Sequence, residues 1–429
     1  MKKLLTTMAA LAILGLVAPA MAQWVPLPEN PAWWPYGDYP LNVGGQPSPS
    51  LSSLGLTQYA AEALYNTAGY WPRSNAGGVY ANELYYTIGG FGPATIAIDP
   101  NDPTSAKYHD NRQSGNDQYD PNTNTWASSK YDGTGPAGYN NPGPLGPPSA
   151  AMPTVGNGAY IGTSQTVAVD TDGDPTLEIL VKGGYPIWGG EFGIYDPDTD
   201  TWSGSSAPVA WTSGGGVAQY LGAAREAGGK VYCIGGYQWG AVGINVQEYD
   251  PVADTWTEMG EDMLPGAASG QFSAVTIGTD IYLLGGVGAS TQILKYDTVA
   301  NTLTDTTHTL LKGVLRSAAV VWGGKILVLG GEGAGGGQTE AVQVYDPATG
   351  TVTYGRNLPI GMSRLAADID PLTGTIYLGG TYQAKLADGT GYNGNDLWSA
   401  NAGWVVPEPG TMALFGFGLL ALLGLRRRK

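Results

Sequence analysis

The chain has 429 residues, of which 20 are basic and 36 acidic, so its formal net charge is −16. Six of the cations lie at the two ends, and residues 23 to 425 therefore carry 14 cations against 36 acids, a net charge near −22. A surface this acidic repels nucleic acid and anionic lipid head groups. We therefore expect no nucleic-acid partner, whereas cation binding and contact with neutral sugars are compatible with the charge.

The composition indicates an all-β fold. There are 67 Gly and 30 Pro, but also 13 Trp and 26 Tyr. Aromatic residues with frequent glycine turns are typical of many short strands, whereas disordered chains are poor in aromatics. Cys233 is the single cysteine, so the chain can form no internal disulfide, and its setting in KVYCIGG predicts a small buried strand residue.

The N-terminus has the layout of a secretory signal peptide. Lys2 and Lys3 precede an apolar run at 11–17, and small residues precede Gln23. We predict that residues 1–22 are removed and that the body is exported. The Trp/Pro-rich segment 23–72 follows, and its QWVPLP stretch reads as an outermost strand that pairs into the last repeat. Residues 404–406 compete for that place.

An internal repeat fills most of the body. Apolar runs ending in Gly-Gly occur at 85–90, 178–184, 230–236, 280–286, 325–331 and 375–380. Each is followed by a Tyr with an apolar residue seven positions later, and these pairs are Tyr119 and Trp126, Tyr195 and Trp202, Tyr249 and Trp256, Tyr296 and Leu303, Tyr345 and Val352. Leu397 and Trp404 keep the spacing in the last copy. Each copy predicts four short strands, which cannot bury their faces alone and must stack.

This pattern of Gly-Gly, Tyr-Asp and Trp, at about 50 residues per cycle, resembles the kelch repeat over residues 73–405. The resemblance implies a kelch-type β-propeller, and we expect six blades. Seven remain an alternative, because the first two glycine pairs are 94 residues apart and residues 149–162 or 42–45 would fit a degenerate blade.

The C-terminus reads VPEPGTMALFGFGLLALLGLRRRK. Its apolar stretch at 412–425 has 14 residues, whereas a bilayer-spanning helix needs about 20. The tail 406–429 resembles the PEP-CTERM sorting signal of Gram-negative bacteria in three parts: Val406, Pro407, Glu408 and Pro409, then an apolar helix, then Arg426, Arg427 and Arg428.

The resemblance of the tail implies a route through the cell. An exosortase of the inner membrane would recognise the tail, cut it near Pro-Glu-Pro, and pass the protein to the outer envelope, cell surface or extracellular matrix. The apolar helix would then hold the inner membrane only transiently. A plain C-terminal membrane anchor is the alternative.

One acidic loop indicates a calcium site. Asp170, Asp172 and Asp174 alternate around Gly173, and Glu178 follows. Carboxylates at this spacing place hard oxygen ligands on one side of a tight loop, as calcium requires. The alternative is an acidic hairpin turn that binds no ion. We expect no other cofactor.

Two further groups are candidates for ligand binding. Arg73, Arg316 and Arg364 precede the predicted inner strands, so they would ring the channel mouth and bind a carboxylate or sugar acid, whereas Arg225 lies later in its strand and fits less well. Hydrogen bonding between blades is the alternative that we favour. The second group is aromatic: Trp188, Tyr237 and Trp239 would stack on neutral sugars, or else pack loops against the ring.

These observations predict an exported cell-envelope propeller that acts as a non-catalytic binding or scaffold module for exopolysaccharide or a surface protein. We predict no catalytic residue. The alternative is a sugar-modifying enzyme, epimerase-like or oxidase-like. Copper oxidation has little support, because the chain offers only His109, His308 and Cys233 as candidate nitrogen and sulfur ligands.

Overall fold

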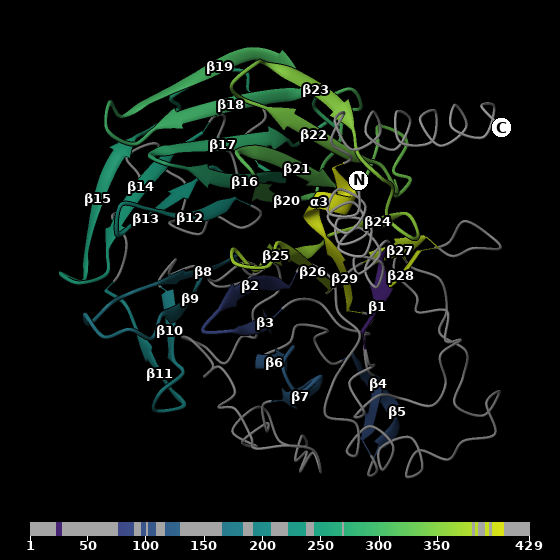
Figure 1. Cartoon of the computed structure of the whole chain (residues 1–429). Coiled ribbons are helices and arrows are strands. Elements are labelled where there is room, and N and C mark those ends of the chain that lie inside the picture. Colours follow the sequence, from purple (N-terminus) through teal and green to yellow (C-terminus); the bar gives the residue numbers. More distant parts are fainter. Residues whose placement is uncertain are drawn as a thin grey trace, which may run out of the picture.

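The structure is a computed structural model that describes residues 23–27, 76–89, 96–99, 102–108, 116–128, 165–182, 192–206, 222–236, 244–267, 270–379, 382–384, 391–393 and 397–406. Six four-stranded antiparallel sheets surround one axis in this part of the chain (Figure 1). The all-β class and the six-bladed propeller are confirmed.

The strands follow one another within each blade, from the axis outward. Blade 1 has β2 (Gly77–Ala81), β3 (Leu84–Ile88), β6 (Asn116–Asp120) and β7 (Thr125–Ser128). Blade 2 has β8 (Gln165–Val169), β9 (Glu178–Lys182), β10 (Phe192–Asp196) and β11 (Thr201–Gly204). Blade 3 has β12 (Ala223–Ala227), β13 (Lys230–Ile234), β14 (Val246–Asp250) and β15 (Thr255–Gly260).

Blades 4 and 5 repeat this order, and blade 6 differs in its outermost strand. Blade 4 has β16 (Phe272–Ile277), β17 (Asp280–Gly285), β18 (Gln292–Asp297) and β19 (Thr302–Thr309). Blade 5 has β20 (Ala318–Trp322), β21 (Lys325–Leu329), β22 (Val342–Asp346) and β23 (Thr351–Tyr354). Blade 6 has β25 (Ala366–Ile369), β26 (Thr375–Gly379), β29 (Trp398–Asn401) and β1 (Val25–Pro26).

The six inner strands form a closed ring. Each of β2, β8, β12, β16, β20 and β25 contacts the next, and β25 contacts β2. Because successive strands are antiparallel, the connections alternate between the two ends of the ring. The turns from first to second and from third to fourth strand lie at one end, the turn face. The loops from second to third strand, and from one blade to the next, lie at the other, the loop face.

The N-terminal strand completes blade 6. Val25 lies opposite Ser399 and Pro26 opposite Trp398, so β1 lies beside β29 (Figure 1). Trp24 is 6% exposed, shares a core cluster with Ala400, and donates its Nε1–H to the carbonyl of Asn357, at 2.9 Å. The expectation that Leu397 and Trp404 take the Tyr and Trp positions of the last repeat was wrong: Ala400 occupies the Tyr position, opposite Ile376, and Trp404 lies in the short helix α3 (Ala402–Val405).

The constant spacing after each Tyr-Asp has a physical cause. In blades 1 to 4 the hydroxyl of the buried tyrosine donates to a side chain five residues later, and these pairs are Tyr119 and Asn124, Tyr195 and Asp200, Tyr249 and Asp254, Tyr296 and Asn301. Each acceptor residue has φ between 50° and 58°, which Asn and Asp tolerate better than most residues. In these four blades a hydrogen bond that spans the turn therefore fixes its length, whereas in blade 5 the Tyr345 hydroxyl bonds His308 Nδ1 and Gly350 takes the left-handed conformation at the same position.

Additional strands lie outside the blades. β24 (Met362–Ser363), β27 (Tyr382–Ala384) and β28 (Gly391–Asn393) form a small sheet on the loop face, and β4 (Ile96–Asp99) pairs with β5 (Asp102–Tyr108). No helix in the described ranges is long and apolar enough to cross a bilayer. The predicted signal peptide and the apolar stretch at 412–425 lie outside the described residues.

Trp24→Ala should destabilise the protein by about 3–5 kcal/mol, because it leaves a cavity in the blade 6 core and removes the bond to Asn357. Urea unfolding of the full chain measures the loss. Leu372→Ala is the control, since Leu372 is 88% exposed, and should change stability by less than about 0.5 kcal/mol. Equal stability of the two variants would contradict ring closure by this segment.

Candidate ligand-binding sites

Several of the predicted site residues cannot be placed. Arg73, Trp188, Tyr237 and Trp239 lie outside the described residues, and so do residues 407–429 of the tail. Val406 is described: it follows α3, and its N–H donates to the carbonyl of Ala402. The structure does place the other two arginines and the acidic loop.

Arg316 and Arg364 meet at one carboxylate on the loop face. Arg316 Nη1 lies 3.1 Å from Glu332 Oε2, and Arg364 Nε lies 3.0 Å from Glu332 Oε1. Ser363 donates its hydroxyl to the same Oε1 at 3.1 Å. Glu332 belongs to blade 5 and Arg364 leads into blade 6, so the cluster bonds two blades together. Hydrogen bonding between blades is the role that the sequence analysis favoured for these arginines. We call these four residues the arginine cluster.

The backbone holds the two arginines in an unusual conformation. Arg316 has φ 53° and Arg364 φ 56°, both in the left-handed region, as is Gln271 in the preceding blade. The N–H of Arg364 donates to the carbonyl of Arg316, whose N–H donates to Gln271, each at 2.7 Å. Left-handed non-glycine residues cost of order 1–3 kcal/mol each and tend to gather at ligand-binding sites. Backbone hydrogen bonds therefore link Gln271, Arg316 and Arg364, which provide one polar side chain from each of three successive blades.

Extra strand pairing makes this part of the loop face rigid. Glu332 pairs with both Leu315 and Gln338, while Met362 of β24 pairs with Thr339 and with Gln383 of β27. The arginine cluster thus lies on paired backbone rather than on an isolated loop. A rigid support keeps binding groups oriented before a ligand arrives.

The charges of the arginine cluster favour an anion. Glu332 balances one of the two positive charges, and its side chain is 10% exposed against 25% for Arg316 and 23% for Arg364. Arg316 uses only Nη1 toward Glu332, so Nε and Nη2 remain to bind a carboxylate in the bidentate geometry that guanidinium favours. Sequence reasoning missed Glu332; its only signal was a charged residue directly after a glycine pair.

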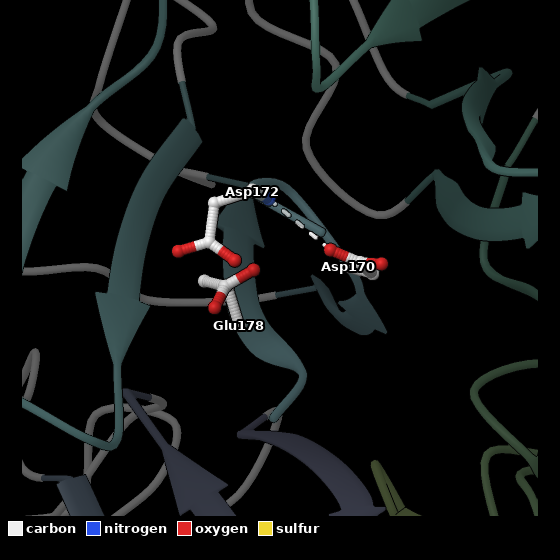
Figure 2. Close-up of side chains that lie close together, drawn as sticks. All are labelled: Asp170, Asp172 and Glu178. Atoms are coloured by element: carbon white, nitrogen blue, oxygen red, sulfur yellow. Dashed lines mark hydrogen bonds between the residues drawn. The ribbon is translucent and has the colours of Figure 1, made fainter. Parts of the chain in front are cut away.

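The acidic loop joins β8 to β9 in blade 2, on the turn face. One carboxylate oxygen from each of Asp170, Asp172 and Glu178 lies within 4.8 Å of the others, and Figure 2 shows the Asp172 and Glu178 carboxylates facing each other. Asp170 Oδ1 accepts the N–H of Asp172 at 3.1 Å (Figure 2), and Glu178 Oε2 accepts that of Thr171 at 2.7 Å.

Asp174 differs from the other three carboxylates. Its Oδ1 accepts the N–H of Thr176 at 2.7 Å, and it is not part of the convergent group. Three convergent carboxylates suit the hard oxygen ligation of Ca²⁺, although calcium takes six to eight oxygens and would need carbonyl or water oxygens as well. The acidic loop and the arginine cluster lie at opposite ends of the ring, so one ligand of small size would not contact both.

Comparison with known proteins supports both motifs. A family model for the Kelch motif matches residues 223–263, which include all four strands of blade 3. A model for the PEP-CTERM protein-sorting motif matches residues 405–429. The chain therefore carries both a kelch repeat and a PEP-CTERM signal, and the second indicates export and sorting to the bacterial envelope.

Similar proteins include kelch-like proteins of mammals. The chain is 27% identical over 220 residues to Kelch-like protein 23 of Homo sapiens, across 48% of this chain and 35% of that protein. It is 29% identical over 161 residues to Kelch-like protein 35 of Mus musculus, across 37% of this chain and 25% of that protein. The similarity thus spans about a third or less of the length of these relatives.

Glu332→Gln should lower stability by about 1–3 kcal/mol, because two guanidinium groups then lack their carboxylate while remaining partly hydrated. Urea unfolding measures the change. Lys325→Gln is the control for breaking a more exposed ion pair: Lys325 pairs with Asp346 at 3.4 Å with 39% of its side chain exposed, and the substitution should cost under about 1 kcal/mol. If the Glu332 variant is no less stable than the control, the cluster does not bond the blades as described.

Proposed function

We propose that the protein is an exported, non-catalytic binding module of the Gram-negative cell envelope whose loop face binds a carboxylate group of an exopolysaccharide. The single observation that carries this proposal is the partly exposed Arg316 guanidinium, which is held on a strained backbone and uses only Nη1 toward Glu332, so that Nε and Nη2 remain for a ligand. The sorting motif supports delivery to the envelope, and the kelch motif supports an interaction role.

The acidic body limits which polysaccharide fits. A polymer with a carboxylate on every residue would be repelled by a chain of net charge −16 before it reached the arginine cluster. The ligand that fits best is largely neutral and carries occasional sugar acids. Neutral sugars would stack on the aromatic residues predicted in the loops, whereas the carboxylate of each sugar acid would bind Arg316.

Arg316→Gln should weaken binding to such a polysaccharide by about 10- to 100-fold, because a charged hydrogen bond contributes about 1.5–3 kcal/mol. The measurement is titration of the full chain, kept in detergent, against a polysaccharide array in native and carboxyl-reduced forms. The parent chain should bind the carboxyl-reduced polysaccharides as weakly as the variant binds the native ones.

Lys325→Gln removes one positive charge from the start of β21, beside the turn face, and should leave the affinity unchanged. Equal weakening by the two substitutions would contradict a site at Arg316. If no polysaccharide binds but an acidic protein of the envelope does, the ligand is a surface protein. Turnover of a sugar would instead favour the sugar-modifying alternative.

We also propose that the acidic loop binds Ca²⁺, because three carboxylates converge there within 4.8 Å. Isothermal titration should show calcium binding that Asp172→Ala abolishes. Asp174→Ala is the matched control: it removes an equal charge two residues away but no member of the convergent group, so it should retain binding. Identical heats from the parent chain and the Asp172 variant would disprove the site.

A further inference from the structure

One position of the inner strands differs sharply between blades. It is the residue opposite the third residue of the second strand, and in four blades it is a valine, 2–6% exposed: Val79, Val167, Val275 and Val320. In blade 3 it is Arg225, opposite Tyr232, and in blade 6 it is Asp368, opposite Tyr377. A cation and an anion therefore replace an apolar residue that the other blades keep.

The two charged residues lie on opposite blades of the ring. Blades 3 and 6 are three steps apart in either direction around six blades, and both residues have the same register within their blades. Both are half-buried although they lie in the middle of an innermost strand, whereas the four valines are buried. Solvent that reaches them in this position must enter along the axis of the ring.

Each side chain binds backbone groups at the inner edge of a strand. Asp368 Oδ2 accepts the N–H of Tyr80 in blade 1, at 2.8 Å, and its Oδ1 accepts the N–H of Ile369 at 2.9 Å. Arg225 Nε donates to the carbonyl of Ala274 in blade 4 at 2.5 Å. Inner edges have no further strand to pair with, so these contacts satisfy groups that would otherwise depend on water.

These contacts leave the charges themselves unneutralised. A guanidinium has five N–H donors, and Arg225 uses Nε and Nη1 toward carbonyl oxygens, which carry no formal charge. None of the ion pairs among the described residues joins Arg225 to Asp368. Burial lowers the pKa of Arg225 and raises the pKa of Asp368, while their mutual attraction opposes both shifts.

A partly buried charge where four other blades have valine costs desolvation free energy, and charged groups with perturbed pKa values cluster at functional sites. A ligand with one charge would leave the opposite charge without a charged partner. A ligand with both charges would satisfy Arg225 and Asp368 together, with its anionic end at the guanidinium and its cationic end at the carboxylate.

We propose that the axis of the ring holds a binding site for a small zwitterion, whose carboxylate binds Arg225 and whose ammonium group binds Asp368. This site is separate from the arginine cluster: Arg316 precedes its inner strand on the loop face, whereas Arg225 and Asp368 lie within theirs. The two sites can therefore be tested independently.

The test is isothermal titration of the full chain with three zwitterions of increasing charge separation: glycine, β-alanine and 4-aminobutyrate. We expect saturable binding with a clear optimum in length. The N-acetyl and carboxamide derivatives of the best zwitterion, which each lack one charge, should bind at least about tenfold more weakly, as expected for loss of a charged hydrogen bond.

Arg225→Gln and Asp368→Asn remove the charges with little change in shape, and Asn retains an acceptor for Tyr80. Each should weaken zwitterion binding at least about tenfold, with unchanged circular dichroism. Arg316→Gln should leave zwitterion binding intact, even where it abolishes binding of sugar acids. Absence of saturable binding, or binding that neither axial substitution affects, would overturn the proposal. The role of Arg225 and Asp368 would then be to hydrogen-bond backbone groups at the strand edges.

Discussion

Closure of the ring by the pairing of β1 with β29 is the constraint on which the rest of the molecule depends. Without β1, the outer edge of blade 6 would expose unpaired backbone groups. Closure also brings blade 6 against blade 1. There the Tyr85 hydroxyl donates to the carbonyl of Ala366, and Tyr377 stacks on Tyr80 with ring centroids 5.4 Å apart. The junction is thus aromatic and polar, whereas the two junctions of blade 5 with its neighbours are largely aliphatic.

Closure also determines where binding groups can lie. A ring of fixed size places the arginine cluster, the axial charges and the acidic loop at three separate levels, since each depends on a different part of the blades. It also explains why strained residues persist: the left-handed backbone of Arg316 is hydrogen-bonded to Gln271 on one side and to Arg364 on the other. The stable ring thereby supports local conformations that would be unfavourable in a free loop.

The sequence predicted the repeated features well, because each has a local physical cause. In blades 1 to 4 the distance from Tyr to the apolar residue is constant because a hydroxyl bond spans the turn, so Tyr249 and Trp256 could be paired by spacing alone. In blade 6 the spacing misled in part, because Leu397 and Trp404 keep it without making that turn. The outermost strand, more than 370 residues away in the chain, was nevertheless predicted correctly, because QWVPLP opens with Trp as other outermost strands do.

The candidate sites were less predictable, because they consist of exceptions to the repeat. Arg316 and Arg364 could be selected by position, but Glu332 occurs once and has no equivalent to mark it. Arg225 fitted the channel mouth poorly and gained significance only when the ring placed it opposite Asp368. Asp174 shared the spacing of its neighbours, yet a turn bond directs it elsewhere. Such relations depend on tertiary geometry.

An engineered disulfide between residues 25 and 399 tests ring closure most directly. Directly opposed residues in antiparallel strands have Cα atoms about 4.5–5.5 Å apart, within the range a disulfide requires. The single native cysteine, Cys233, is buried, so it does not compete with the two engineered cysteines for disulfide formation. In the oxidised Val25→Cys, Ser399→Cys variant, peptide mapping should find the two ends of the chain covalently joined. Two free thiols, in a protein that remains folded, would contradict closure by the N-terminal strand.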